Sequence, residues 1–304
     1  MKRPLLIFIV LAFGLSWAAV LPVWLDGRGL GSPLLLGLAT LMMFTPTAGV
    51  LGVWAVTRTP FKEWARQTGL TLGERKGRTV ALVLATWFGV PLLIFLAIGL
   101  SAAVGLMSLD LGGLSGLRAA LEARGAPVPA DLGSVVAIQI ALGVLAGPAL
   151  NAIPALGEEW GWRGWLLPRL VSGNGVLAGL LFSGAVWGVW HAPLTLLGYN
   201  YPRLGSWAAL FFIGFCVLAG VLFGWLRLRT GSVWPAVVGH GSLNAVAPAV
   251  LVLGDAAAPP NEVLVGLTGL VGWVLLAVVC VALLRFFPVR PPQPAAEPEP
   301  EPAA

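Results

Sequence analysis

Long apolar stretches, separated by short polar segments, recur along almost the whole chain. Each stretch is long enough for a helix to cross a bilayer, which takes about 20 apolar residues. The pattern therefore predicts an all-α fold, a polytopic membrane helix bundle of about eight transmembrane helices. The predicted spans are residues 4–25, 33–56, 79–106, 134–157, 176–197, 204–226, 232–253 and 262–286. A Ser-Gly-Asn-Gly turn at 172–175 allows the fourth span to continue to about residue 170.

The polar segments indicate how the chain is organised. We expect residues 1–290 to form one integral membrane domain with its chemical core at about 134–253. A basic segment at 57–78 is expected to carry a short amphipathic helix around Pro60–Thr68 on the membrane surface. The tail at 291–304 alternates proline with glutamate and alanine, so it is expected to be disordered. The first apolar run is longer than a secretory signal and lacks a small-residue cleavage site, so we expect it to be retained as a span.

Composition and charge agree with a membrane location. Hydrophobic residues make up 58% of the 304 residues and charged residues only 10%, whereas soluble domains carry about 25% charged residues. With the N-terminus inside, the inner segments hold 14 of the 18 lysines and arginines, and the outer segments hold only Arg28, Arg118, Arg124 and Arg203. This asymmetry places both termini in the cytoplasm. It also explains the basic isoelectric point by topology and contact with the lipid bilayer, so we expect no nucleic-acid partner.

Ionisable side chains inside the apolar stretches are confined to the later half of the chain. They are Glu158, Glu159, Arg163, His191 and His240, accompanied by Asn244, and the chain has no other histidine. A charge in hydrocarbon costs at least ~2.5–3.5 kcal/mol, and such groups are usually functional. Their presence on three different predicted helices therefore predicts a shared site.

Helical spacing indicates which of these groups pair. Glu159 and Arg163 are four residues apart, so they lie on one face and can neutralise each other. Glu158 points ~100° away and lacks that partner. Asn244 lies four residues after His240 on the same face, and the same spacing places an aromatic wall, Trp187, directly below His191.

Depth in the membrane brings the groups together. If the fourth and fifth spans form an antiparallel hairpin about the turn at 172–175, Glu158 and His191 lie level with each other. Both would then lie ~20–25 Å above the turn, at ~1.5 Å per residue. By the same rise, His240 lies ~15 Å above the inner segment that precedes its span. Three helices thus present polar groups at a similar depth.

The chemistry that fits this set is hydrolysis by an activated water. A carboxylate in a low-dielectric pocket binds a proton more readily than in water, which suits Glu158 as a general base. His191 can hold the water, and His240 with Asn244 can donate to a developing oxyanion. Glu158, His191 and His240 also make a donor set for one divalent metal, zinc. No HExxH motif is present and asparagine is a poor zinc ligand, so a cofactor is not firmly implied, and both mechanisms stay open.

Three motifs carry a resemblance to a known family. The sequence "EEWGWR" matches Glu-Glu-x-x-x-Arg, "WGVWH" matches aromatic-x-x-x-His, and "HGSLN" matches His-x-x-x-Asn. Their order, spacing and membrane setting resemble the CPBP family of intramembrane proteases, which includes type II CAAX prenyl endopeptidases and bacterial bacteriocin-immunity proteins. The resemblance covers about residues 134–253, and Trp187 stands where phenylalanine is commoner.

The resemblance implies a multi-pass cell-membrane endopeptidase whose partner is a membrane-associated protein or peptide substrate. It implies that Glu158 and His191 activate water, that His240 and Asn244 stabilise the oxyanion, and that Glu159 with Arg163 completes the first motif. CAAX-type processing of a prenylated protein follows only by analogy. The alternative is a non-catalytic membrane immunity or scaffold protein. A transporter is disfavoured because the polar groups occupy one half of the chain.

Overall fold

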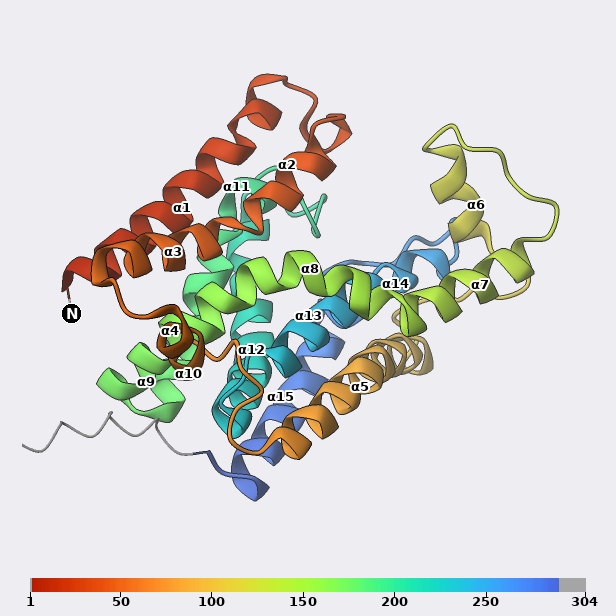
Figure 1. Cartoon of the computed structure of the whole chain (residues 1–304). Helices are drawn as coiled ribbons and strands as arrows, with labels where there is room; N and C mark the ends of the chain where they lie inside the picture. Colours follow the sequence, from red (N-terminus) through yellow and green to blue (C-terminus); the bar gives the residue numbers. More distant parts are fainter. Residues whose placement is uncertain (1, 290–304) are drawn as a thin grey trace, which may run out of the picture.

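The computed structural model describes residues 2–289 and builds them from helices joined by short loops (Figure 1). The first half contains α1 (Lys2–Leu25), α2 (Leu35–Met42), α3 (Thr45–Thr57), α4 (Phe61–Gln67), α5 (Lys76–Ala103), α6 (Ser115–Glu122) and α7 (Leu132–Leu145). The second half contains α8 (Gly147–Glu159), the π-helix η2 (Trp160–Leu166), α9 (Leu167–Asn174), α10 (Val176–Trp190), α11 (Ala192–Thr195), α12 (Trp207–Thr230), α13 (Trp234–Val246), α14 (Ala249–Val252) and α15 (Leu270–Phe286). A short 3₁₀ turn, η1 (Gly29–Gly31), follows α1. The predicted disordered tail at 291–304 lies outside the described residues.

The apolar helices confirm a polytopic membrane protein. Within the described part of the chain, five helical segments are long and apolar enough to cross a bilayer, or six if α7 is joined to the helix that follows it. Two shorter apolar helices, α10 and α15, lie within the remaining predicted spans, 176–197 and 262–286, and α15 begins only at Leu270. The number that cross the bilayer and the cytoplasmic location of both termini stay predictions.

The fourth predicted span differs from its prediction in one respect. The continuation past residue 157 is present, because one helix runs from Gly147 to Asn174. However, the segment breaks after Leu145, and the two parts are bent by 50°. Pro148 lies in the first turn of α8. Because proline has no N–H to continue the ladder of the preceding helix, its position explains the break.

The fifth predicted span also ends early. Instead of continuing to residue 197, α10 ends at Trp190 and His191 occupies its C-cap. Pro193 lies two residues later in the first turn of α11. Since proline cannot donate to the carbonyl of a continuing helix, the break falls at His191 and frees this residue from the regular helix.

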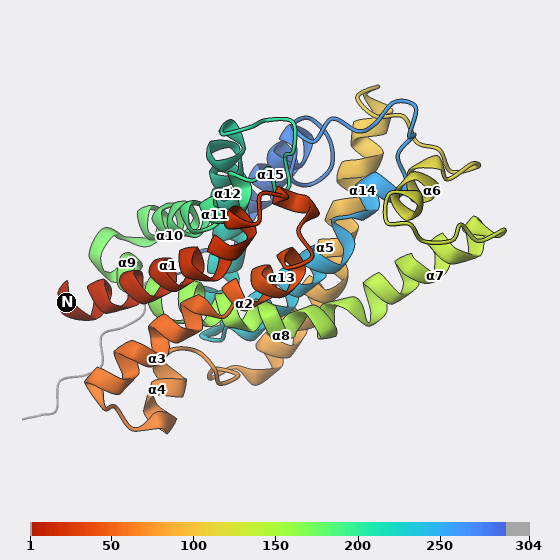
Figure 2. The ribbon, with the colours of Figure 1, turned by 90° about the horizontal axis from the view of Figure 1, so that it is seen from above.

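The helices that carry the polar groups form the centre of the molecule. Helices α8, α10, α12 and α13 lie between α1–α4 on one side and α6–α7 on the other (Figures 1 and 2). Helix α10 packs closely on α12, and α13 packs on both α8 and α5. The chemistry-bearing segments of the sequence therefore lie in the interior of the bundle.

The packing of α10 on α12 depends on glycine. A Cβ on Gly184 would meet the Cα of Val217 at 2.7 Å and the carbonyl oxygen of Cys216 at 2.8 Å. We expect Gly184→Ala to destabilise the protein by about 1–3 kcal/mol through overpacking. Gly89→Ala in α5 is the matched control, because nothing lies within 4 Å of its Cβ position. Thermal unfolding of the purified protein compares the two variants, and equal midpoints would contradict the close packing.

Candidate active site

The first motif is buried where an α-helix passes into a π-helix. Glu158 and Glu159 are the last residues of α8, and Arg163 lies in η2. Their side chains are essentially inaccessible, with 1%, 0% and 0% of their surfaces exposed. Short π-helical insertions occur frequently at functional sites. The buried acidic pair and the irregular helix together mark this position as the candidate site.

The predicted ion pair between Glu159 and Arg163 is present. Arg163 Nη1 donates to Glu159 Oε1 at 2.9 Å, and both side chains are fully buried. His240 Nδ1 lies 3.0 Å from the same carboxylate oxygen. Arg163 also lies over the ring of Trp187, at 4.2 Å from its centroid. One carboxylate therefore joins the first motif on η2 to the third motif on α13.

Glu158 has a different partner from its neighbour. Trp187 Nε1 donates to Glu158 Oε2 at 2.6 Å, so the hydrogen bond crosses from α10 to α8. His191 is not bonded directly to Glu158. Instead, its Nδ1 lies 2.9 Å from the main-chain carbonyl oxygen of Trp187. The direct partner of Glu158 is therefore Trp187, one turn before His191, and the juxtaposition of His191 with Glu158 across the hairpin stays a prediction.

The hydrogen bonds indicate which ring nitrogen of each imidazole carries a hydrogen. A carbonyl oxygen only accepts, so His191 Nδ1 carries a hydrogen, and Nε2 of the neutral ring holds a lone pair. His240 Nδ1 donates to Glu159 in the same way when that carboxylate is ionised. His240 can then donate through Nε2 only as an imidazolium, whose charge Glu159 balances. The sequence predicts His240 as an oxyanion donor and gives no sign of its bond to Glu159.

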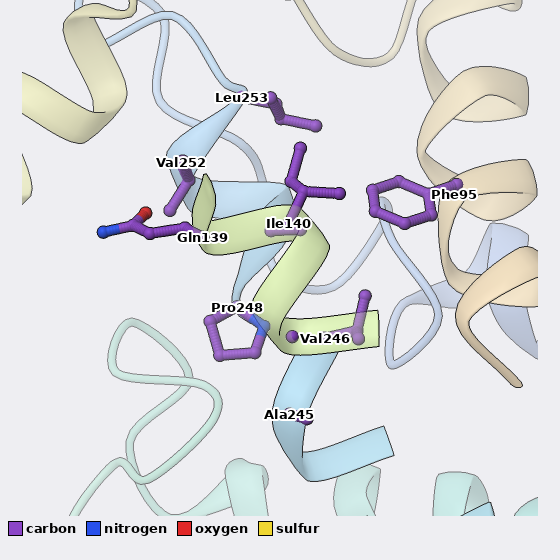
Figure 3. A pocket seen from close by; sticks show the side chains of 10 residues that line it. Phe95, Gln139, Ile140, Ala245, Val246, Pro248, Val252 and Leu253 are labelled. Atoms are coloured by element: carbon purple, nitrogen blue, oxygen red, sulfur yellow. The ribbon is translucent and has the colours of Figure 1, made fainter. Parts of the chain in front are cut away.

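Asn244 differs from the other predicted site residues in its exposure. It lies one turn beyond His240 on α13, but its side chain is exposed, whereas the sequence had placed it with the buried set. The next residue, Ala245, lines an apolar pocket of about 240 Å³ between α5, α7 and the α13–α14 region. Figure 3 shows the side chains of Phe95, Ile140 and Val252 around this pocket. Along α13, Asn244 thus lies between buried His240 and the first pocket-lining residue of this helix, Ala245.

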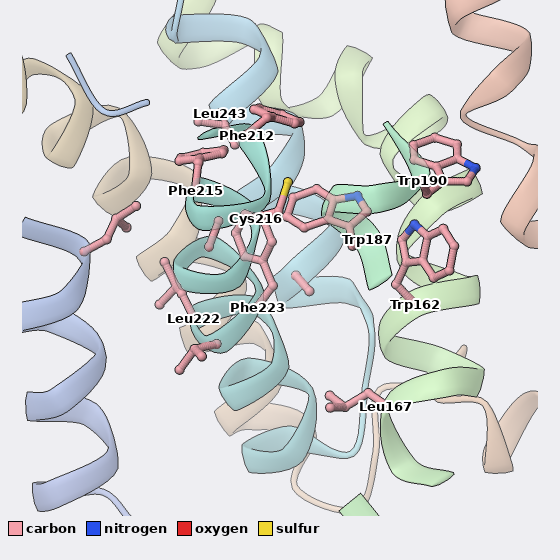
Figure 4. Close-up of a cluster of buried hydrophobic side chains, with 14 of the residues drawn as sticks. Trp162, Leu167, Trp187, Trp190, Phe212, Phe215, Cys216, Leu222, Phe223 and Leu243 are labelled. Atoms are coloured by element: carbon pink, nitrogen blue, oxygen red, sulfur yellow. The ribbon is translucent and has the colours of Figure 1, made fainter. Parts of the chain in front are cut away.

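Aromatic rings surround the polar cluster. His191 packs edge-on against Trp190 and Phe212, with ring centroids 4.7 and 4.8 Å apart, respectively. His240 stacks on Phe223 at 5.8 Å. Figure 4 shows Trp187 at the centre of this group, between Phe223 on one side and the Trp162 and Trp190 rings on the other. These rings exclude water, which strengthens the electrostatic interactions inside.

A segment that the sequence assigned to the membrane surface also supports the site. Helix α4 forms at the predicted position, but Trp64 and Thr68 are buried, with 2% and 1% of their surfaces exposed. Trp160 Nε1, at the start of the π-helix, donates to Thr68 Oγ1 at 2.9 Å. Gly164 passes so close that a Cβ would lie 2.6 Å from the Thr68 carbonyl oxygen. The basic inner segment therefore packs against the helix that carries the glutamates.

Separation decides whether Glu158, His191 and His240 can share one metal ion, because their hydrogen bonds leave Glu158 Oε1 and both Nε2 atoms without a partner in the described residues. Among residues 2–289, no three His, Cys, Asp or Glu side chains lie close enough together to hold one metal ion. As arranged, these donors do not fit a three-ligand zinc site, so no step proposed below uses a metal.

The fold and site define a multi-pass α-helical membrane protein with a buried carboxylate–imidazole cluster. Residues 139–246 match the family model of type II CAAX prenyl endopeptidase Rce1-like proteins. CAAX prenyl protease 2 of Methanococcus maripaludis is 27% identical over 100 residues, which cover 31% of this chain and 37% of that protein. All six predicted site residues lie within the matched region. These matches agree with the resemblance carried by the three motifs, and they cover about a third of the chain.

Proposed function

We propose that the protein is an intramembrane endopeptidase that hydrolyses a peptide bond of a membrane-associated protein, with CAAX-type processing as the reaction by analogy. The observation that carries the proposal is the meeting of three motif segments, on α8–η2, α10 and α13, in one buried hydrogen-bonded cluster. Ionisable groups brought together inside an apolar bundle are costly and are retained for function. The match to the prenyl endopeptidase family model supports the same reaction class.

The proposed reaction begins with a water activated by Glu158. One oxygen of this carboxylate, Oε2, is bonded to Trp187, which leaves Oε1 to take the proton from water. The Nε2 lone pair of His191 accepts the second hydrogen of the water and orients it. The water oxygen then bonds to the scissile carbonyl carbon, and the carbonyl oxygen becomes an oxyanion.

The second half of the reaction uses the groups on α13. Protonated His240, balanced by Glu159, donates through Nε2 to the oxyanion, and the carboxamide of Asn244 is the second donor. The bond between the carbonyl carbon and the amide nitrogen then breaks. Glu158 returns its proton to the leaving amine nitrogen, and the second hydrogen of the water stays on the new carboxyl group, so the products are a carboxylic acid and an amine. The apolar pocket beside Asn244 receives a hydrophobic part of the substrate.

The experiment is product mapping with purified protein in liposomes that contain membrane-anchored peptides. Mass spectrometry should find new amino and carboxyl termini with the natural chain. His191→Ala should lower the cleavage rate about 100- to 10,000-fold, the usual contribution of a proton-transfer group. Equal product formation by this variant would contradict the proposal. So would a complete lack of products with the natural chain across prenylated and unprenylated peptides, which would favour the immunity or scaffold alternative.

A further inference from the structure

Trp187 contacts both groups that are proposed to activate the water. Its side-chain Nε1 donates to Glu158 Oε2 at 2.6 Å. Its main-chain carbonyl oxygen accepts from His191 Nδ1 at 2.9 Å. The residue is buried, with 1% of its surface exposed. One residue therefore links the carboxylate on α8 to the imidazole at the end of α10.

The indole ring is itself held firmly in place. Arg163 lies 4.2 Å from the ring centroid on one side, and Phe223 packs against the ring at 6.2 Å between centroids. His240 makes an edge-on contact at 5.4 Å. With these neighbours around the ring, the N–H has a fixed direction. A donor that is fixed before the reaction needs no reorganisation when charge moves.

We propose that Trp187 is a positioning residue for the hydrolysis, and this inference rests on the proposed function. Its N–H holds one oxygen of Glu158 and so fixes the rotamer that directs the other oxygen to water. Its carbonyl holds the hydrogen on His191 Nδ1 and so keeps the Nε2 lone pair available. An aromatic ring without the N–H would fill the same space but would leave the carboxylate free to rotate.

The kinetic test is Trp187→Phe, which removes the donor and keeps the aromatic ring and the main-chain carbonyl. We expect kcat to fall about 10- to 100-fold, the loss that corresponds to one charge-assisted hydrogen bond, with KM unchanged. Trp165→Phe is the matched control, because Trp165 is equally buried but its Nε1 has no hydrogen-bond partner among the described residues. Its kcat should match that of the natural chain. A Trp187→Phe variant with unchanged kcat would overturn the proposal.

A second measurement is independent of catalysis. In ¹⁵N spectra of the indole groups, Trp187→Phe identifies the Trp187 signal by its loss. Glu158→Gln should move that signal to lower proton frequency, because a neutral amide oxygen accepts a weaker hydrogen bond than a carboxylate. The Trp165 signal should stay in place. A Trp187 signal that does not respond to Glu158→Gln would overturn the positioning role, whereas absent peptidase activity with a responsive signal would count against the proposed function alone.

Discussion

Arg163→Ala is expected to lower the free energy of unfolding by about 3–5 kcal/mol, the usual cost of breaking a buried ion pair. The guanidinium is fully buried and donates to Glu159 at 2.9 Å. Without it, Glu159 keeps only His240 as a partner inside the bundle. The variant also loses the stacking of the guanidinium on Trp187. Thermal or denaturant unfolding of the purified protein measures the change.

Two further variants separate charge from packing in this prediction. Arg169→Ala is the matched control, because Arg169 also stacks on a tryptophan, at 4.1 Å from the Trp165 centroid, but is exposed and has no carboxylate partner in the structure. Arg169→Ala should lower the free energy of unfolding by only about 0.5–1 kcal/mol, the contribution of an exposed cation–π contact. Adding Glu159→Gln to Arg163→Ala should recover part of the lost free energy of unfolding, because it removes a buried carboxylate that has lost one of its two partners. An Arg163→Ala variant as stable as Arg169→Ala would contradict the buried pair.

Glu158→Gln is expected to lower the rate of peptide hydrolysis about 100- to 10,000-fold, because an amide cannot accept the proton of water. Glutamine has nearly the same shape and can still accept from Trp187 through its amide oxygen. We therefore expect the variant to insert and fold as the natural chain does. Cleavage rates of membrane-anchored peptides measure the loss, and unfolding midpoints check the fold.

Glu63→Gln is the control for this substitution. Glu63 is an exposed glutamate on α4 and bonds only to Gln67, at 3.0 Å, in the structure. The same chemical change there should leave the cleavage rate unaltered. If Glu158→Gln also left the rate unaltered, Glu158 would not be the base, and the assignment of the two neighbouring glutamates to different tasks would be wrong.

Helical spacing was enough to predict the local relations in the site. Because side chains four residues apart share a face, the Glu159–Arg163 pair could be predicted and is present. The same spacing placed Trp187 beside His191, and their rings make an edge-on contact at 5.5 Å. The continuation of the helix past the glutamates also followed from the turn at 172–175.

Relations between helices were less predictable. The hairpin register assumed a uniform rise of ~1.5 Å per residue, whereas Trp160–Leu166 is π-helical. The hydrogen bond from Trp187 to Glu158 across the hairpin was not predicted. The bond from His240 to Glu159 joins residues 81 positions apart, and no local pattern could indicate it. Only the hydrogen bond of Trp187 had a signal in the sequence, because a buried indole N–H usually finds an acceptor.

The packing of residues 57–78 against the π-helix and α13 could not be predicted from the sequence. Residues 57–78 are basic and amphipathic, which is typical of a membrane-surface element. Yet Thr68 accepts a hydrogen bond from Trp160, and the Leu70 carbonyl accepts one from Trp234. Such contacts depend on where the helix ends meet in space, which periodicity does not determine.

The most direct test of the account is the rate of peptide hydrolysis by metal-depleted protein. The natural chain and Glu158→Gln would be purified, treated with a chelator, checked for metal content and incubated with the same membrane-anchored peptide. We expect the metal-free natural chain to cleave at an undiminished rate and Glu158→Gln to cleave about 100- to 10,000-fold more slowly. Loss of cleavage on metal removal with recovery on adding zinc, or equal cleavage by both proteins, would contradict it.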